Sequence, residues 1–125
     1  SKNKRLDLNE LSHSLLNTIP KNHMDFYKNL KIKHEEGDYV FVHAGLRPGV
    51  EMDKQNEFDM LTIRDEFIHS KTIFDKKVVF GHTIFKEPFN QNARIGIDTG
   101  AYAYGNLTCA VLEGSKVEFL TASLK

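Results

Sequence analysis

Two short apolar runs, each leading to a histidine beside a glycine turn, constrain the fold of this chain most. Residues 39–42 (Tyr-Val-Phe-Val) lead directly to His43, and residues 78–80 (Val-Val-Phe) lead to Gly81 and His82. Runs of this length that are rich in β-branched and aromatic side chains are typical of buried strands. A residue just past such a strand lies at the rim of a sheet, where α/β proteins often form ligand sites.

The imidazoles at these two strand ends suggest a metal ion. Neutral imidazole is the commonest metal ligand in proteins. For His43 or His82 alone, a hydrogen-bonded histidine at the rim or in the core is an equal alternative. The matched placement of the pair, about forty residues apart, favours two strand ends that converge on one metal.

Four motifs, in this order along the chain, resemble the later motifs of a known enzyme family. They are Val42-His43-Ala44-Gly45-Leu46, with Arg47-Pro48-Gly49-Val50 directly after it, Leu61-Thr62-Ile63-Arg64, Gly81-His82-Thr83, and Ile97-Asp98-Thr99-Gly100-Ala101. Together they resemble the bacterial-type serine/threonine phosphoprotein phosphatases. That group includes the symmetrical diadenosine tetraphosphatases of the calcineurin-like metallophosphoesterase superfamily. The resemblance runs from about residue 20 to the C-terminus.

The resemblance implies a fold and a chemistry. The fold is α/β, the C-terminal half of a metallophosphoesterase β-sandwich flanked by helices, with a mixed to antiparallel sheet in one domain over residues 1–125. In the family, two divalent metal ions, commonly including manganese, activate a water that attacks phosphorus. The resemblance makes His43 and His82 the two histidine ligands of the second metal. The substrate would be a phosphorylated protein, or another phosphoester such as a dinucleotide.

Three further residues are candidates for the site, and each has a structural alternative. Arg64 matches two phosphate oxygens with its guanidinium, or pairs with the acidic residues that follow it. Asp98 lies at a strand end and either orients a ligating histidine or caps its own turn, with equal weight. Tyr102 is a candidate for the leaving-group side of the cleft. The alternative is simple alternation along an extended segment, which would bury one of Tyr102 and Tyr104 and expose the other.

The three earlier motifs of the family are absent from these 125 residues. They are Asp-x-His, Gly-Asp-x-x-Asp-Arg-Gly and Gly-Asn-His-Glu/Asp, and they carry the first metal's ligands, the bridging aspartate and the general-acid histidine. Asn22-His23-Met24-Asp25 imitates the third motif without its glycine, so His23 is expected to be a solvated helix residue. Thr62 stands where the family often has tryptophan.

Two imidazoles alone bind an ion weakly, because the ion needs further donors to replace its hydration. We therefore expect a metal-dependent phosphoester hydrolase whose isolated chain is inactive. The alternative is a non-catalytic phosphatase fragment that acts as a self-associating or partner-binding module.

Composition excludes several other functions. Lys plus Arg and Asp plus Glu are seventeen each, so no basic field recruits nucleic acid or an anionic membrane. The apolar runs are too short to span a bilayer, and no signal-peptide pattern is found. The single cysteine, Cys109, is expected to be a buried small hydrophobe on a strand, in a reducing cytoplasm.

Periodicity and turn residues predict helices in the first part of the chain and strands in the last. The expected helices cover 7–18, 20–30, 53–63 (with Asp53 as the cap) and 65–70, and the expected strands cover 39–42, 77–80, 94–97, 107–112 and 117–120. Turn residues at 35–38 predict a hairpin of 32–34 with 39–42, or a first strand at 39–42 that follows a helix, and turn residues at 113–116 join the last two strands in a hairpin. Half of a sandwich leaves an open sheet edge and an uncovered apolar face. We therefore expect a homo-oligomer, a partner that supplies the missing N-terminal half, or a cover formed by the leucine-rich first helix.

Overall fold

A computed structural model describes residues 7–124. The chain divides into two compact units, residues 1–31 and 32–125, and each is described by itself. The single domain expected over residues 1–125 stays a prediction. Within the described residues, no helix is both long enough and apolar enough to cross a membrane.

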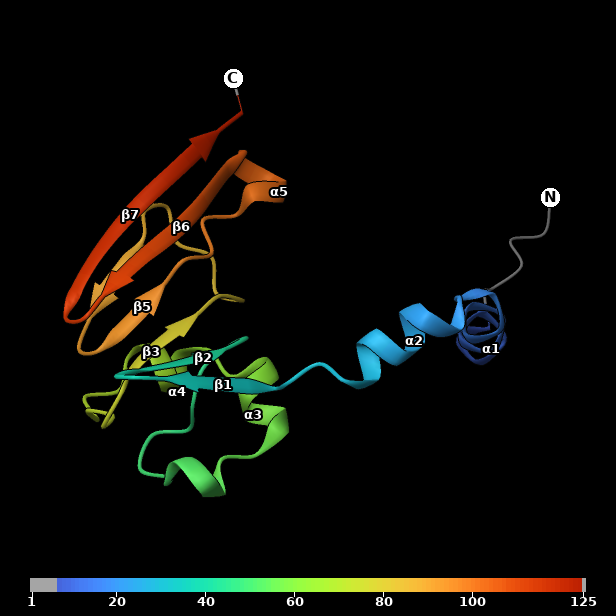
Figure 1. The fold of residues 1–125 in the computed structure, drawn as a ribbon, viewed down its shortest axis with the longest axis horizontal. Helices are drawn as coiled ribbons and strands as arrows, with labels where there is room; N and C mark the ends of the chain where they lie inside the picture. The colour runs from blue at the N-terminus through green and yellow to red at the C-terminus, as the bar shows by residue number, and fades with distance from the viewer. Residues whose placement is uncertain (1–6, 125) are drawn as a thin grey trace. The chain divides into compact units, whose positions relative to one another are not determined.

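The described part of the first unit contains two helices, α1 (Leu8–Thr18) and α2 (Lys21–Lys28) (Figure 1). Asp7 caps α1, because its side chain accepts a hydrogen bond from the Asn9 N–H at 2.9 Å. The apolar stripe of α1 is exposed in the described residues. His23 lies exposed on α2, as the sequence predicts.

The second unit is built on a five-stranded mixed sheet in the order β1-β2-β3-β5-β4. Its strands are β1 (Lys33–Glu36), β2 (Tyr39–Val42), β3 (Lys77–Phe80), β4 (Phe89–Gln91) and β5 (Arg94–Gly96). The central strands β2, β3 and β5 are parallel, and the edge strands β1 and β4 pair antiparallel with their neighbours. The α/β class and the mixed sheet predicted from the sequence are therefore confirmed.

The segment between β2 and β3 covers one face of this sheet. It contains a 3-10 helix, η1 (Met52–Lys54), and two short helices, α3 (Glu57–Thr62) and α4 (Asp65–Ile68). The core on this face consists of buried side chains from both layers, namely Val40, Val42, Ala44, Leu46, Met60, Ile63, Phe67, Val78 and Phe80. Asp53 does not cap a helix here; Asn56 caps α3, and its side chain accepts from the Asp59 N–H.

An antiparallel hairpin lies on the other face of the sheet. Its strands are β6 (Asn106–Glu113) and β7 (Lys116–Ser123), and a short helix, α5 (Ala101–Tyr104), precedes it (Figure 1). Alternate hairpin side chains pack on the sheet residues Tyr39, Val79 and Ile95. Cys109 is exposed on the outward face of β6, so the prediction of a buried cysteine is wrong. Successive side chains of a strand point to opposite faces, so Cys109 lies on the face of β6 opposite to that of Thr108 and Ala110.

Candidate functional site

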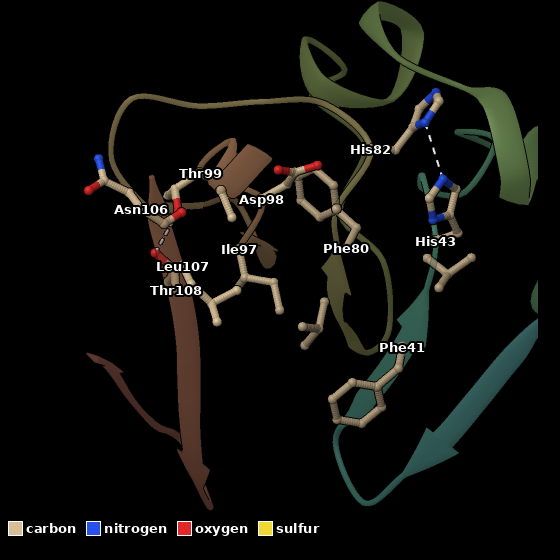
Figure 2. Close-up of a pocket in the computed structure, with 14 residues that line it drawn as sticks. Phe41, His43, Phe80, His82, Ile97, Asp98, Thr99, Asn106, Leu107 and Thr108 are labelled. Atoms are coloured by element: carbon tan, nitrogen blue, oxygen red, sulfur yellow. Dashed lines mark hydrogen bonds between the residues drawn. The ribbon is translucent and has the colours of Figure 1, made fainter. Parts of the chain in front are cut away.

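The parallel pairing of β2 and β3 brings His43 and His82 together. Val40 lies opposite Val78 and Phe41 opposite Val79, so both strands end at the same edge of the sheet. His43 Nε2 lies 3.2 Å from His82 Nδ1, and the ring centroids are 4.9 Å apart. Figure 2 shows the two rings close together, with a dashed line between the two nitrogens. The convergence of the two strand ends expected from the sequence is present.

His82 occupies a strained backbone turn. Its φ is +63°, and the Thr83 N–H donates to the Gly81 carbonyl at 2.6 Å. A hydrogen bond across one central residue with positive φ is the rare γ-turn, which is costly for a residue with a side chain. Residues in such conformations are often found at functional sites. The Gly81 N–H also donates to the His43 carbonyl at 2.9 Å, which ties the turn to β2.

Burial and nearby positive charge lower the pKa of His82. Burial is the largest cause, followed by the charges of Arg64 and His43, while the Thr62 backbone and the Asp98 charge oppose the shift. A lowered pKa favours the neutral ring, which has a lone pair available for a metal ion.

A cavity of about 470 Å³ opens beside the pair. Its walls are mostly apolar, with the two histidines and a few other polar side chains among the lining residues, which include Phe41, Phe80, Ile97, Asp98, Thr99, Leu107 and Thr108. In Figure 2, the residues around Asp98 and β6 lie on one side and the histidines on the other. An apolar cavity with a few polar groups is typical of a binding site.

Arg64 lies beside the histidine pair. Its Nη1 donates to the carbonyl oxygen of His82 at 2.8 Å. Among the described residues, no ion pair joins Arg64 to Asp65 or Glu66, and the Asp65 carboxylate instead lies 3.8 Å from His69. Contact of Arg64 with phosphate stays a prediction.

Asp98 lines the cavity and caps its own turn, since its Oδ1 accepts from the Gly100 N–H at 3.0 Å. Tyr102 is not among the residues that line the cavity. It lies on α5, 89% exposed, while its neighbour Ala101 lines the cavity. Tyr104 is also 67% exposed, so the predicted alternation is wrong because this segment is helical. A substrate contact of Tyr102 and an orienting role of Asp98 stay predictions.

The histidine pair fits part of a metal site. Two nitrogen ligands about 2.1 Å from one ion lie about 3.0 Å apart at a right angle and about 3.4 Å apart at a tetrahedral angle. The observed separation of 3.2 Å lies between these values. Within residues 7–124, however, no three His, Cys, Asp or Glu side chains form a group that could hold a metal. The pair alone therefore falls short of the donor set that a metal ion needs.

The sequence interpretation missed an ionic contact in the loop that follows His43. Asp59 accepts two hydrogen bonds from Arg47, at 2.6 Å from both Nε and Nη2, and Arg47 belongs to the loop that follows His43. Gln55 bonds to the backbone of the same loop. The pair is twelve residues apart in sequence, so helix periodicity gives no signal for it.

Comparison with known proteins supports the fold. No family model matches the chain, and no curated protein matches it by sequence. Among solved structures, it is similar to the crystal structure of a "putative diadenosine tetraphosphatase", with 23% identity and a TM-score of 0.69. The match covers 90% of this chain and 61% of that one, so this chain spans less than two thirds of that protein. The likeness shows that the two proteins share an α/β fold.

Proposed function

We propose that this chain is the histidine-bearing part of a metal-dependent phosphoester hydrolase of the metallophosphoesterase type. The observation that carries the proposal is the pair His43 and His82, whose ring nitrogens lie 3.2 Å apart at two parallel strand ends. The fold shared with a protein named as a diadenosine tetraphosphatase supports the same class of reaction. Phosphorylated proteins and dinucleotides are both candidate substrates.

His43 and His82 would hold a divalent metal, with manganese as our candidate in a complete site. When bound, the metal would polarise the phosphoryl group and lower the pKa of a water molecule. Arg64 places a positive charge beside the pair, which would attract the oxygens of a phosphate group. Asp98 lines the same cavity and places a negative charge near His82.

We propose further that the 125-residue chain alone is inactive. The described residues provide two imidazoles and no third metal donor grouped with them, and manganese prefers sites rich in oxygen ligands. Bound ions should therefore be held weakly. A complete site would need donors from residues outside these 125 or from another chain.

Metal titration tests the proposal. We expect isothermal calorimetry to detect weak zinc binding, because zinc accepts imidazole readily, and weaker manganese binding. His43→Ala and His82→Ala should each abolish the zinc signal. His34→Ala is the matched control, because His34 is exposed on the edge strand β1. Zinc binding that survives both site substitutions would contradict the proposed metal role.

Hydrolysis of p-nitrophenyl phosphate tests the expected inactivity. With manganese present, the chain should show no turnover above background. Turnover that disappears in His43→Ala would contradict inactivity and would indicate that a second copy supplies the missing donors.

A non-catalytic binding module is the second candidate function. It is favoured by the hairpin β6–β7, whose outward face exposes Leu107 and Leu120 at 64% and 62%. Such a face is suited to a protein partner or to a second copy.

A further inference from the structure

Arg64 makes a contact that neither of its expected roles includes. It is an exposed residue between α3 and α4, and its Nη1 donates to the carbonyl oxygen of His82, eighteen residues away in the sequence, at 2.8 Å. A guanidinium is a rigid fork of donors, so its bond to a main-chain oxygen restrains the position of that peptide. The restrained peptide belongs to the turn that presents His82.

This turn needs external support. His82 has a φ of +63° and is the central residue of a γ-turn closed by the 2.6 Å bond between Thr83 N–H and Gly81 oxygen. A histidine leaves this conformation readily unless the surrounding structure holds it. The bond from Gly81 N–H to the His43 carbonyl fixes the peptide that enters the turn. The bond from Arg64 fixes the peptide that leaves it.

The turn also sets the place of the His82 ring. The Nδ1 atom of this ring lies 3.2 Å from His43 Nε2. A change in the backbone of the turn would therefore carry the ring away from His43.

We propose that Arg64 is a positioning residue, which holds the γ-turn at His82 and thereby keeps His82 Nδ1 directed at His43 Nε2. Its effect on metal binding is exerted through His82. Only the metal-binding part of this inference rests on the proposed function; the conformational part rests on the contacts alone.

The test compares the full chain with Arg64→Met, which removes the donors and keeps much of the side-chain length. The three-bond coupling between the amide and α protons of His82 reports its φ, and the imidazole signals of His43 and His82 report the ring contact. Both should change in Arg64→Met, and zinc affinity measured by calorimetry should fall about tenfold or more. The control is Lys71→Met, an exposed cation in the loop after α4, which should change neither.

Two results would overturn the proposal. The first is an unchanged His82 coupling with unchanged imidazole signals in folded Arg64→Met. The second is an unchanged zinc affinity in Arg64→Met when zinc binding still requires His82. If the unmodified chain binds no zinc at all, the proposed metal role fails. The amide–α proton coupling of His82 then still tests whether Arg64 holds the turn.

A second pair of variants covers the case in which Arg64→Met does not fold. Glycine adopts positive φ without strain, so His82→Gly removes the need for support. Adding Arg64→Met to His82→Gly should then leave the urea midpoint nearly unchanged. If Arg64→Met is as damaging in the glycine background as in the unmodified chain, Arg64 does not act through the turn.

Discussion

The residues around Asp59 favour the ionised form of its carboxylate. Its side chain is 6% exposed, and it accepts hydrogen bonds from Arg47 and from the Asn56 side chain. The hydrogen bonds from Arg47 are the main cause that lowers the pKa of Asp59, and burial opposes them. The ionised carboxylate is thus part of the folded structure and joins α3 to the loop after His43.

This pairing predicts a loss of stability in acid. An aspartate in an unfolded chain titrates at about pH 3.9, and the folded pKa lies lower, so the stabilisation is present above about pH 4. It is lost as the pH falls from there toward the folded pKa. The urea midpoint of the unmodified chain should fall in this window. Asp59→Asn should be less stable at neutral pH and should show a smaller decrease in acid.

Asp53→Asn is the control for this measurement, because Asp53 is an exposed aspartate in η1. Its urea midpoint should follow that of the unmodified chain at every pH. An acid response of Asp59→Asn as large as that of the unmodified chain would contradict a role for the ionised Asp59.

At the scale of elements, the packing of α4 against the loop after β2 depends on a missing side chain. A Cβ added to Gly45 would lie 2.4 Å from Phe67 Cδ1, and Phe67 is fully buried. The ring of Phe67 has little room to move away, since it also contacts the rings of Phe74 and Phe80. Gly45 also has a φ of +156°, which residues with side chains rarely adopt. Gly45→Ala should therefore cost about 1–3 kcal/mol of unfolding free energy, as overpacked cores do.

Gly81→Ala is the control for Gly45→Ala, because Gly81 has neither a positive φ nor a close contact. A Cβ at Gly81 would meet its nearest atom, Asp98 Cβ, at 3.6 Å, which is ordinary contact. Urea denaturation should show a much smaller loss for this variant. Equal losses for the two substitutions would mean that the general flexibility of glycine, rather than the contact with Phe67, determines the effect.

The sequence predicted the elements that carry a local signal. The strand at 77–80 has the expected bounds, and the hairpin at the end of the chain lies where its turn residues indicate. The strand β4 and the helix α5 were missed. Three residues give too little alternation to identify β4, and the four residues of α5 lie between Gly100 and Gly105, which both adopt the left-handed conformation.

At the candidate site, too, the sequence predicted what has a local signal and missed a contact that has none. The sequence placed His43 and His82 together because each lies within two residues of the end of a strand, and parallel neighbours end at one edge. It did not indicate the bond from Arg64 to the His82 carbonyl. That bond requires a loop between two helices to meet a turn after β3, and no local pattern reports such a contact.

The second unit as a whole contains two β-sheets of unequal size. A five-stranded sheet faces a hairpin of only two strands, each eight residues long. The inward face of the hairpin packs on the sheet, while the outward face exposes Leu107, Val111 and Leu120. Strands that are apolar on both faces are typical of sheets covered on both sides. The outward face is therefore the surface on which we expect association.

We expect this face to drive self-association, most simply into a two-fold dimer. Several hundred Å² of apolar surface at about 25 cal/mol per Å² would contribute several kcal/mol, against association costs of about 4–15 kcal/mol. The dimer should therefore be weak and depend on concentration.

Light scattering at micromolar to millimolar concentration should show a mass rising above the 14.3 kDa of one chain. Leu107→Lys with Leu120→Lys should restore the monomer, whereas Leu11→Lys on α1 should leave association intact. If Leu11→Lys alone abolishes association, the helices of the first unit form the contact. A mass of one chain at every concentration would contradict association altogether.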